Sequence, residues 1–423
     1  MRILLLTQIV PFPPDSGPKV KTLGVLRYLA RSHEVHLVSF ARSAEEEAHA
    51  RALAAYCRSV TTVPLHRSRL RDAYYLARSL VSGRPFLVER DDSAAVRGAI
   101  SRLLAERAFD AVHADQLSMA QFAVDLDLPL RVLDEHNAVW TIVRRSARQE
   151  RLGPKRALAE IEWRKLRAYE RKICDLFDRV TVVSREDRRA LGLDGADSDR
   201  THVIPISVDT GALRFEPPEP GARDVVSVAT MFYPPNVEGV YWFGSEVFPA
   251  IRQKLPETRF HVVGSRPPGR IVGLATPESG IVVTGYLPDL APVFRQSAVI
   301  VVPLHSGSGM RVKILEAFAR GKPVVSTTIG VEGIEAEAGR HLLVADDPAD
   351  FAEAVIRLIE DTTLARRVSG AARALVEARY DWRTALRGLD GLYRPSVWPG
   401  AATPTFGDKR EWKTSSTGPV PGR

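Results

Sequence analysis

The feature that most constrains the fold is a repeated alternation of short apolar runs with longer helix-patterned segments. Short apolar runs bounded by turn residues predict buried strands, and the segments between them predict crossover helices, which together form parallel sheets. Seven runs in the first half predict strands at residues 2–7, 34–40, 60–64, 109–114, 130–135, 180–184 and 202–205. Six more predict strands at residues 224–229, 259–263, 281–284, 298–302, 323–326 and 341–344. The pattern therefore predicts an α/β protein with two doubly wound, Rossmann-like domains.

The length of the chain agrees with two domains, because 423 residues exceed the ~100–200 residues of an ordinary single core. Residues 210–223 hold three prolines and two glycines with little apolar content, which predicts a linker. We expect an N-terminal domain at residues 1–209 and a C-terminal domain at residues 224–379. Residues 394–423 are rich in Gly, Pro, Ser, Thr and charge, which predicts a flexible tail.

Composition excludes several protein classes. Apolar residues at 45% and charged residues at 26% are ordinary globular values, unlike those of disordered, collagenous or disulfide-scaffold chains. Cys57 and Cys174 stand far apart, so neither a disulfide framework nor a cysteine-based zinc site is expected. The short apolar start runs into a Pro/Gly turn instead of a signal sequence, and no ~18-residue apolar run predicts a membrane span. We expect a cytoplasmic protein, or one peripheral on the inner face of the membrane.

Basic residues cluster in two segments of this chain, whose formal net charge is +8. Residues 140–172 hold eleven Lys/Arg and four Glu, and residues 58–84 hold six Arg and one Asp. Two interpretations of the first segment stay open: a solvated helix face, or a surface for anionic lipid headgroups. In the lipid hypothesis Arg144, Arg145 and Arg148 face the membrane, and donor binding does not depend on them. Nucleic acid is not expected as a partner, because no nucleic-acid module is recognised.

A small-residue loop in the second half predicts a phosphate site. The strand at residues 298–302 leads through Gly307, Ser308 and Gly309 into a helix, so free backbone N–H groups and the positive helix end converge. Arg311 and Lys313 near the helix start would add charge for a diphosphate. Glu316, about two turns in, would accept hydrogen bonds from sugar hydroxyls. A plain strand–turn–helix with surface charges is the equally weighted alternative.

This segment resembles the donor-binding signature of glycosyltransferase family 4, retaining enzymes of the GT-B fold whose signature has two glutamates flanking seven residues. Glu316 matches the second glutamate, which implies a contact to the nucleotide ribose. Ser308 occupies the place of the first, which contacts the donor sugar. A subgroup carries the variant Gly-x-Gly-x-Arg-x-Lys-x-x-Glu, and this chain follows it at Gly307, Gly309, Arg311, Lys313 and Glu316. The resemblance implies a variant donor site, with Arg311 and Lys313 on the diphosphate.

The resemblance covers most of residues 1–393. Tyr286 and Leu287, within Gly-Tyr-Leu-Pro-Asp at residues 285–289, resemble the loop that meets the nucleotide base. The Tyr-Asp-Trp at residues 380–382 resembles the segment that returns to the first domain, so a last helix is expected within residues 380–393. Gly17 occupies the family's glycine-containing loop, which approaches the donor phosphate and the acceptor, and Lys19 and Lys21 would add charge there. The alternative is that Gly17 only permits a turn.

Two predicted strand ends carry candidate catalytic residues. Asp115 follows the strand at residues 109–114, and His136 follows the strand at residues 130–135. Carboxyl ends of neighbouring parallel strands meet at one edge of a sheet, where ligands bind. By resemblance, Asp115 matches a position where many family members have a histidine that assists transfer, and His136 matches a second histidine near the acceptor. A purely structural role is the alternative for both.

The resemblance implies a retaining glycosyltransferase of hexosyltransferase type. It would move a sugar from a nucleotide diphosphate sugar to a saccharide or lipid-linked saccharide in cell-surface polysaccharide synthesis. No Asp-x-Asp motif is evident at the donor end, so we expect neither a metal nor another cofactor. Two alternatives stay open: a non-catalytic sugar-nucleotide-binding subunit, motivated by Ser308 and Asp115, and a GT-B sugar-nucleotide epimerase.

Overall fold

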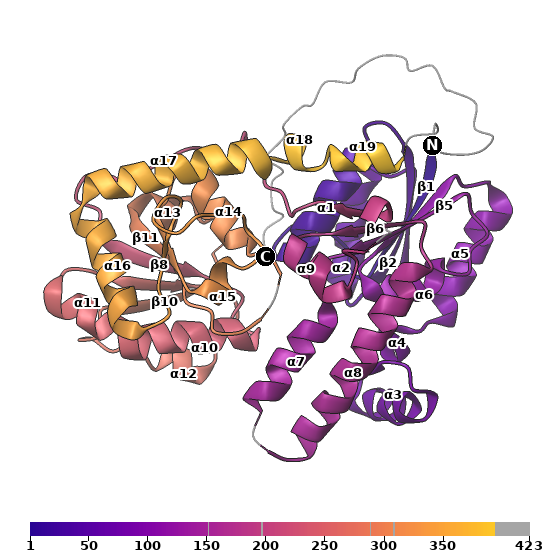
Figure 1. Ribbon diagram of the computed structural model, residues 1–423, viewed down its shortest axis with the longest axis horizontal. Coiled ribbons are helices and arrows are strands. Elements are labelled where there is room, and N and C mark those ends of the chain that lie inside the picture. Colours follow the sequence, from indigo (N-terminus) through magenta and orange to yellow (C-terminus); the bar gives the residue numbers. More distant parts are fainter. Residues whose placement is uncertain (151, 196–197, 288, 308, 394–423) are drawn as a thin grey trace.

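The computed structural model describes residues 1–150, 152–195, 198–287, 289–307 and 309–393. It contains two parallel sheets, one in each half of the molecule (Figure 1). The first sheet has the strand order β3-β2-β1-β4-β5-β6-β7, and the second has the order β10-β9-β8-β11-β12-β13. The strand order reverses between β1 and β4 in the first sheet and between β8 and β11 in the second. In open parallel sheets, ligands bind beyond the carboxyl ends of the strands at such points.

The thirteen described strands confirm the thirteen predicted ones, with ends that differ by at most two residues. Those of the first sheet are Arg2–Thr7 (β1), Glu34–Ala41 (β2), Ser59–Pro64 (β3), Ala111–Asp115 (β4), Leu130–Glu135 (β5), Arg179–Val182 (β6) and Thr201–Val203 (β7). Those of the second are Asp224–Val228 (β8), Phe260–Val263 (β9), Ile281–Gly285 (β10), Ser297–Val302 (β11), Val324–Ser326 (β12) and Leu343–Val344 (β13). Central strands such as β11 are buried at every position, so their sequences are nearly continuous apolar runs.

Helices cover both faces of each sheet. In the first domain they are Gly17–Leu29 (α1), Ala44–Ala50 (α2), Arg69–Ser82 (α3), Phe86–Asp91 (α4), Ala94–Glu106 (α5), Leu117–Ala123 (α6), Val139–Gln149 (α7), Pro154–Asp175 (α8) and Arg185–Leu191 (α9). In the second they are Pro234–Trp242 (α10), Phe248–Lys254 (α11), Gly269–Val272 (α12), Ala291–Gln296 (α13), Val312–Ala319 (α14), Thr328–Val331 (α15), Pro348–Glu360 (α16) and Thr362–Arg379 (α17). Shorter helical segments are Arg51–Ala55 (η1), Ser198–Arg200 (η2) and Phe243–Val247 (η3).

The two faces of each sheet form separate apolar cores. In β1, Leu4 and Leu6 join one core while Ile3 and Leu5 join the other, as the two-residue period of a strand requires. One core of the second domain also includes Val208, from the segment that follows β7. The domains therefore share apolar packing as well as chain connections.

The chain crosses between the domains twice. The predicted linker at residues 210–223 lies between β7 and β8, and Arg373 of α17 donates to the carbonyl oxygens of Thr210 and Leu213, both at 3.0 Å. After α17 the chain returns through Trp382–Ala385 (α18) and Gly388–Leu392 (α19), which cross to the first domain (Figure 1). Leu389 and Leu392 are buried in the same core as Ile3 and Leu5. The predicted tail at residues 394–423 lies outside the described residues.

Candidate functional site

The loop between β11 and α14 depends on glycines at two described positions. Gly307 and Gly309 have φ values of 101° and 79°, which side chains disfavour. A Cβ atom on Gly309 would lie 1.8 Å from Oδ1 of Asn137 in the first domain, so a larger residue would collide there. The loop sits where the second sheet reverses its strand order. It is therefore both at the expected ligand position and in close contact with the opposite domain.

Three charged side chains at the start of α14 lie beside this loop and are largely shielded from solvent: Arg311, Lys313 and Glu316. The Arg311 guanidinium donates to the carbonyl of Gly309, and Lys313 Nζ donates to Oδ1 of Asn236, on α10, at 3.1 Å. Burial and the positive charge of Arg311 lower the pKa of Lys313 to about 7. Burial also lowers the pKa of Arg311 and raises that of Glu316. An anionic ligand would compensate the two cations, which makes this cluster a candidate diphosphate site.

The residues predicted to meet the nucleotide base lie at the same edge of the second sheet. Tyr286 and Leu287 follow β10, which stands three strand positions from β11 in the sheet. Three strand spacings separate the two strand ends by roughly 14 Å. Tyr286 has 67% of its surface exposed, whereas Leu287 packs partly into the domain core. This edge thus offers an exposed aromatic ring beyond β10 and the cationic loop beyond β11.

The predicted glycine loop of the first domain faces α14. A Cβ atom on Gly17 would lie 3.5 Å from Cγ2 of Val312, at the start of α14, which is an ordinary contact distance. Lys19 pairs with Asp15 at 3.1 Å, between Nζ and Oδ1. Lys21, which the sequence suggested would add charge to this loop, is instead buried and bonded to Asp134. That expectation was wrong because Lys21 lies on the inner face of α1.

Asp115 and His136 meet at the carboxyl ends of β4 and β5. Nε2 of His136 lies 2.9 Å from Oδ1 of Asp115, and the Thr22 hydroxyl donates to Oδ2 of Asp115 at 2.9 Å. Both members of the pair are buried. Gln116, directly after Asp115, has a φ of 74°, which is unusual for a residue with a side chain and often marks functional sites. The two predicted catalytic residues therefore form one oriented hydrogen-bonded pair.

A second buried layer supports this pair. Asp134 accepts hydrogen bonds from Lys21 and from the Thr181 hydroxyl, the latter at 2.5 Å. Although burial raises the pKa of Asp134, the Lys21 ammonium and then His113 hold that pKa below its usual range. Nε2 of His113 lies 3.6 Å from Oδ2 of Asp134, and Nδ1 of His113 lies 2.6 Å from the Tyr393 hydroxyl. The helix that returns to the first domain thus leads directly to a residue of this cluster.

The same cluster has the spacing of a cation site. One ligand atom each from His113, Asp115 and Asp134 lies within 4.8 Å of the others. Lys21 already donates to Asp134, however, and Thr22 already donates to Asp115. The lysine therefore supplies positive charge to the carboxylates, and metal independence stays a prediction.

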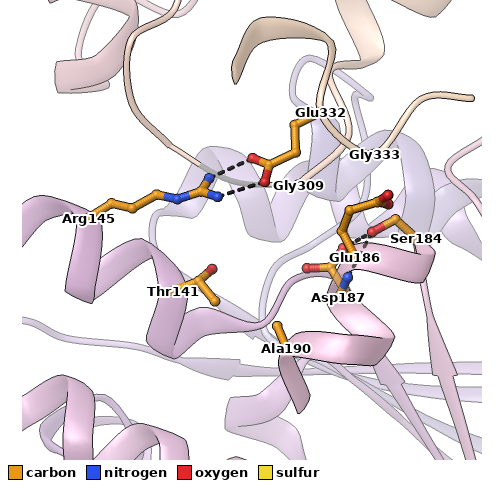
Figure 2. Close-up of a pocket in the computed structure, with 9 residues that line it drawn as sticks. All are labelled: Thr141, Arg145, Ser184, Glu186, Asp187, Ala190, Gly309, Glu332 and Gly333. Atoms are coloured by element: carbon orange, nitrogen blue, oxygen red, sulfur yellow. Dashed lines mark hydrogen bonds and ion pairs between the residues drawn. The ribbon is translucent and has the colours of Figure 1, made fainter. Parts of the chain in front are cut away.

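An arginine from α7 joins the two domains. The Arg145 guanidinium binds both carboxylate oxygens of Glu332 at 2.6 Å each (Figure 2). It also donates to the carbonyl of Gly307 in the donor loop. This contact contradicts the lipid-facing role expected for Arg145. The helical pattern could place Arg145 on the polar side of α7 but could not show that this side meets the other domain.

Buried carboxylates from other helices fix the start of α7. Glu170 of α8 accepts from the backbone N–H of Val139 at 2.6 Å, and Asp187 of α9 accepts from that of Ala138 at 2.9 Å. Burial raises the pKa of both carboxyl groups, that of Glu170 to about 8, and in either protonation state their oxygens can accept from these N–H groups at the helix N-terminus. The position of Arg145 is therefore set by three packed helices.

A polar cavity of about 160 Å³ opens beside this arginine, at the junction of the domains (Figure 2). Its lining residues come from α7, α9 and two loops of the second domain: Thr141, Arg145, Ser184, Glu186, Asp187, Ala190, Gly309, Glu332 and Gly333. The Ser184 hydroxyl donates to Oδ2 of Asp187 at 2.5 Å. The lining holds three carboxylates and one arginine that Glu332 already binds, so the cavity favours hydroxyl groups over anions.

Two family models match the chain, one in each domain. The model described as Glycosyltransferase Family 4 matches residues 17–212, and the model described as Glycosyl transferases group 1 matches residues 222–361. Together they span most of both domains. The chain belongs to glycosyltransferase family 4.

Curated relatives of this family-4 chain match it over part of their length. An uncharacterized 44.6 kDa protein in the cps region of Klebsiella pneumoniae is 24% identical over 37% of this chain and 42% of the relative. A D-inositol 3-phosphate glycosyltransferase of Acidothermus cellulolyticus is 28% identical over 52% of this chain and 53% of the relative. The matched part is thus about half the length of these relatives.

Solved structures match the family-4 chain over nearly its whole length. Sucrose-phosphate synthase from Thermosynechococcus elongatus superposes with a TM-score of 0.67 at 16% identity, covering 94% of this chain and 99% of that one. HepE of Anabaena, in complex with UDP and glucose, gives 0.66 at 15% identity, covering 92% and 98%. These likenesses confirm the predicted GT-B fold.

The structure brings together most of the predicted site of this family-4 chain. Asp115 and His136 are bonded to each other, while Gly17 lies against the start of the helix that carries Lys313. Ser308 lies outside the described residues. Sequence reasoning missed Asn137 and Glu332, which meet the opposite domain in the cleft. Asn137 directly follows His136, and this position at a strand end was the available signal.

Proposed function

We propose that this chain is a retaining glycosyltransferase that moves a sugar from a nucleotide diphosphate sugar to a saccharide or lipid-linked saccharide. The observation that carries the proposal is the pair of enclosed cations, Arg311 and Lys313, at a glycine loop across the cleft from the Asp115–His136 pair. HepE was solved with UDP-glucose, and the Klebsiella relative lies in a cps region. The first supports a nucleotide-sugar donor, and the second supports a role in cell-surface polysaccharide synthesis, which we propose takes place on the cytoplasmic side of the membrane.

The donor half of the site would stabilise the leaving group. As the bond between the anomeric carbon and the phosphate oxygen breaks, negative charge grows on the diphosphate. Arg311, Lys313 and the loop N–H groups would hold that charge in a preorganised, partly dry setting. We propose that these cations replace a metal ion. Glu316 would accept hydrogen bonds from the ribose hydroxyls.

The first domain would position the reacting sugars. Asp115 fixes Nε2 of His136, whereas Nδ1 of His136 has no hydrogen-bond partner among the described residues. Nδ1 is therefore the atom we assign to a sugar hydroxyl in the complex. The acceptor oxygen would attack the donor carbon from the face that the diphosphate leaves, which retains the configuration, and its proton would pass to the departing phosphate oxygen.

The polar cavity supports a neutral acceptor. Its lining holds three carboxylates, two side-chain hydroxyls and one arginine that Glu332 already binds. Carboxylates and hydroxyls suit sugar hydroxyls, while a phosphate would meet like charge. We therefore propose an acceptor sugar without a phosphate at this position, in contrast to the D-inositol 3-phosphate named for three curated relatives.

A donor panel tests the proposal. The purified chain is incubated with radiolabelled UDP-, GDP- and ADP-sugars, with and without neutral oligosaccharides or membrane extract, and the product anomer is assigned by NMR. Transfer that depends on acceptor and retains configuration supports the proposal. An altered sugar without acceptor indicates an epimerase, and binding without turnover indicates a non-catalytic subunit.

A further inference from the structure

Helix α3 exposes its apolar side chains to solvent. The helix begins where the Ser68 side chain accepts from the backbone N–H of Arg71 at 3.3 Å, and it ends at Gly83, whose φ is 74°. Leu70 and Val81 have 86% and 91% of their surface exposed, and Tyr74 has 61%. Such exposure is unusual for large apolar residues that share one helix.

These residues form one continuous stripe, which we call the α3 stripe. Its members recur at intervals of three and four along the helix, and all are exposed: Leu70, Ala73, Tyr74, Ala77, Leu80 and Val81. The opposite side of α3 faces the protein through Ser79 and the half-buried Tyr75 and Leu76. Ser79 there is fully buried, and Lys165 of α8 donates to its carbonyl at 2.7 Å and to its hydroxyl at 2.9 Å. The α3 stripe thus points away from the protein and is left to solvent.

Arginines border the α3 stripe. At 3.6 residues per turn, Arg69 lies along one border and Arg71 and Arg78 lie along the other. Arg78 pairs with Glu89 at 2.9 Å, whereas the side chains of Arg69 and Arg71 are exposed. The excess of six arginines over one aspartate in residues 58–84 is therefore centred on this helix.

We propose that α3 docks this chain on an anionic phospholipid surface. The α3 stripe would enter the boundary between headgroups and acyl chains, while Arg69 and Arg71 would contact lipid phosphates. This inference deepens the lipid-linked part of the proposed function and rests on it. Large exposed apolar patches mark interaction surfaces in general, and the bordering arginines select the anionic lipid. Two copies of the chain packed through the same face would bring like charges together, which disfavours a self-interface.

The neighbouring hairpin is consistent with this surface. Figure 1 shows the α7–α8 hairpin projecting from the first domain, and Lys165 ties α8 to α3. Leu152, between α7 and α8, is 88% exposed. Arg144 lies over the rings of Trp140 and Trp163, at 5.7 and 5.3 Å from their centroids. The basic residues of the hairpin are therefore partly committed to contacts within the protein, and α3 is the better-defined docking element.

Vesicle flotation tests the proposal with the full chain. Wild type should bind phosphatidylcholine vesicles that contain phosphatidylglycerol, and binding should weaken as salt is added. The double change Leu70→Ser and Val81→Ser should reduce partitioning at least about tenfold, which is about 1.4 kcal/mol. Val272→Ser is the matched control, because Val272 is a half-exposed valine on a helix of the other domain. Changing Arg69 and Arg71 to Gln should remove most of the salt dependence.

A second measurement reports insertion directly. In the Tyr74→Trp variant, lipids brominated on the acyl chains should quench the extra fluorescence of the new indole. The proposal is overturned if the wild-type protein does not bind the vesicles. It is also overturned if the Leu70/Val81 double variant binds them as strongly as the wild-type protein does. A concentration-dependent dimer that the double variant abolishes likewise overturns it, since it would assign the face to a second copy. Transfer to a soluble acceptor without vesicles tests the proposed function separately.

Discussion

Arg145 and Glu332 form a two-point ion pair across the interdomain cleft, with both nitrogen–oxygen distances at 2.6 Å. The pair joins α7 of the first domain to the residue after α15 of the second. Arg145 also holds the carbonyl of Gly307, so a single guanidinium connects domain closure to the geometry of the donor loop. The pair therefore offers a way to test whether the cleft acts as one unit.

A double-mutant cycle should detect this coupling. We expect Arg145→Gln and Glu332→Gln each to lower kcat/KM, and the two effects to fall short of additive by about 1 kcal/mol or more. Arg164→Gln is the control, because Arg164 pairs with Glu160 within α8 and does not reach the cleft. Fully additive losses would mean that Arg145 and Glu332 are not coupled and that the ion pair itself does not contribute to kcat/KM.

Glu316→Gln should lower donor affinity or turnover at least about tenfold, because a carboxylate contact to the ribose is lost without a change of volume. The fold should persist, since the amide has nearly the same shape. Steady-state kinetics with varied donor, together with thermal unfolding, check this. Wild-type kinetics in the variant would remove Glu316 from the donor site.

Donor binding should take up a proton above neutral pH. Burial and Arg311 lower the pKa of Lys313 to about 7 in the free chain, and a bound diphosphate would raise it again. Affinity for UDP or GDP should therefore fall as pH rises above 7, by at most tenfold per pH unit for one proton. Calorimetry in buffers of different ionisation enthalpy measures the uptake. In Lys313→Met the uptake should vanish, and its persistence would assign the proton to another group.

His136→Asn should separate transfer from donor binding. We expect turnover to fall about 100-fold, the scale of a lost acid–base or orienting group, while nucleotide affinity stays unchanged. Asp115→Asn should act in the same direction, because its oxygen orients Nε2 of His136 at 2.9 Å. Calorimetric titration with nucleotide accompanies the turnover assay. A matching loss of nucleotide affinity would indicate a structural role for the pair.

The sequence predicted the sheets well because buried parallel strands such as Ser297–Val302 are continuous apolar runs with local turn signals on either side. It also placed Asp115 and His136 at neighbouring strand ends, where the structure bonds them. The contacts between domains could not be predicted, because Arg145 and Glu332 are 187 residues apart and no periodic pattern relates them. Burial of Lys21 was missed for a similar reason, since its partner Asp134 lies on a distant strand. Local patterns specify elements, while side-chain pairing across elements depends on the assembled fold.

Nucleotide binding by calorimetry tests the central claim most directly, since the account requires Arg311 and Lys313 to neutralise a diphosphate. Wild type should bind UDP or GDP, and Arg311→Ala and Lys313→Ala should each weaken binding at least about tenfold. The control variant Arg270→Ala, which removes an exposed arginine paired with Glu238 on the same domain, should bind as wild type does. Wild-type affinity in both the Arg311 and the Lys313 variants would contradict the account.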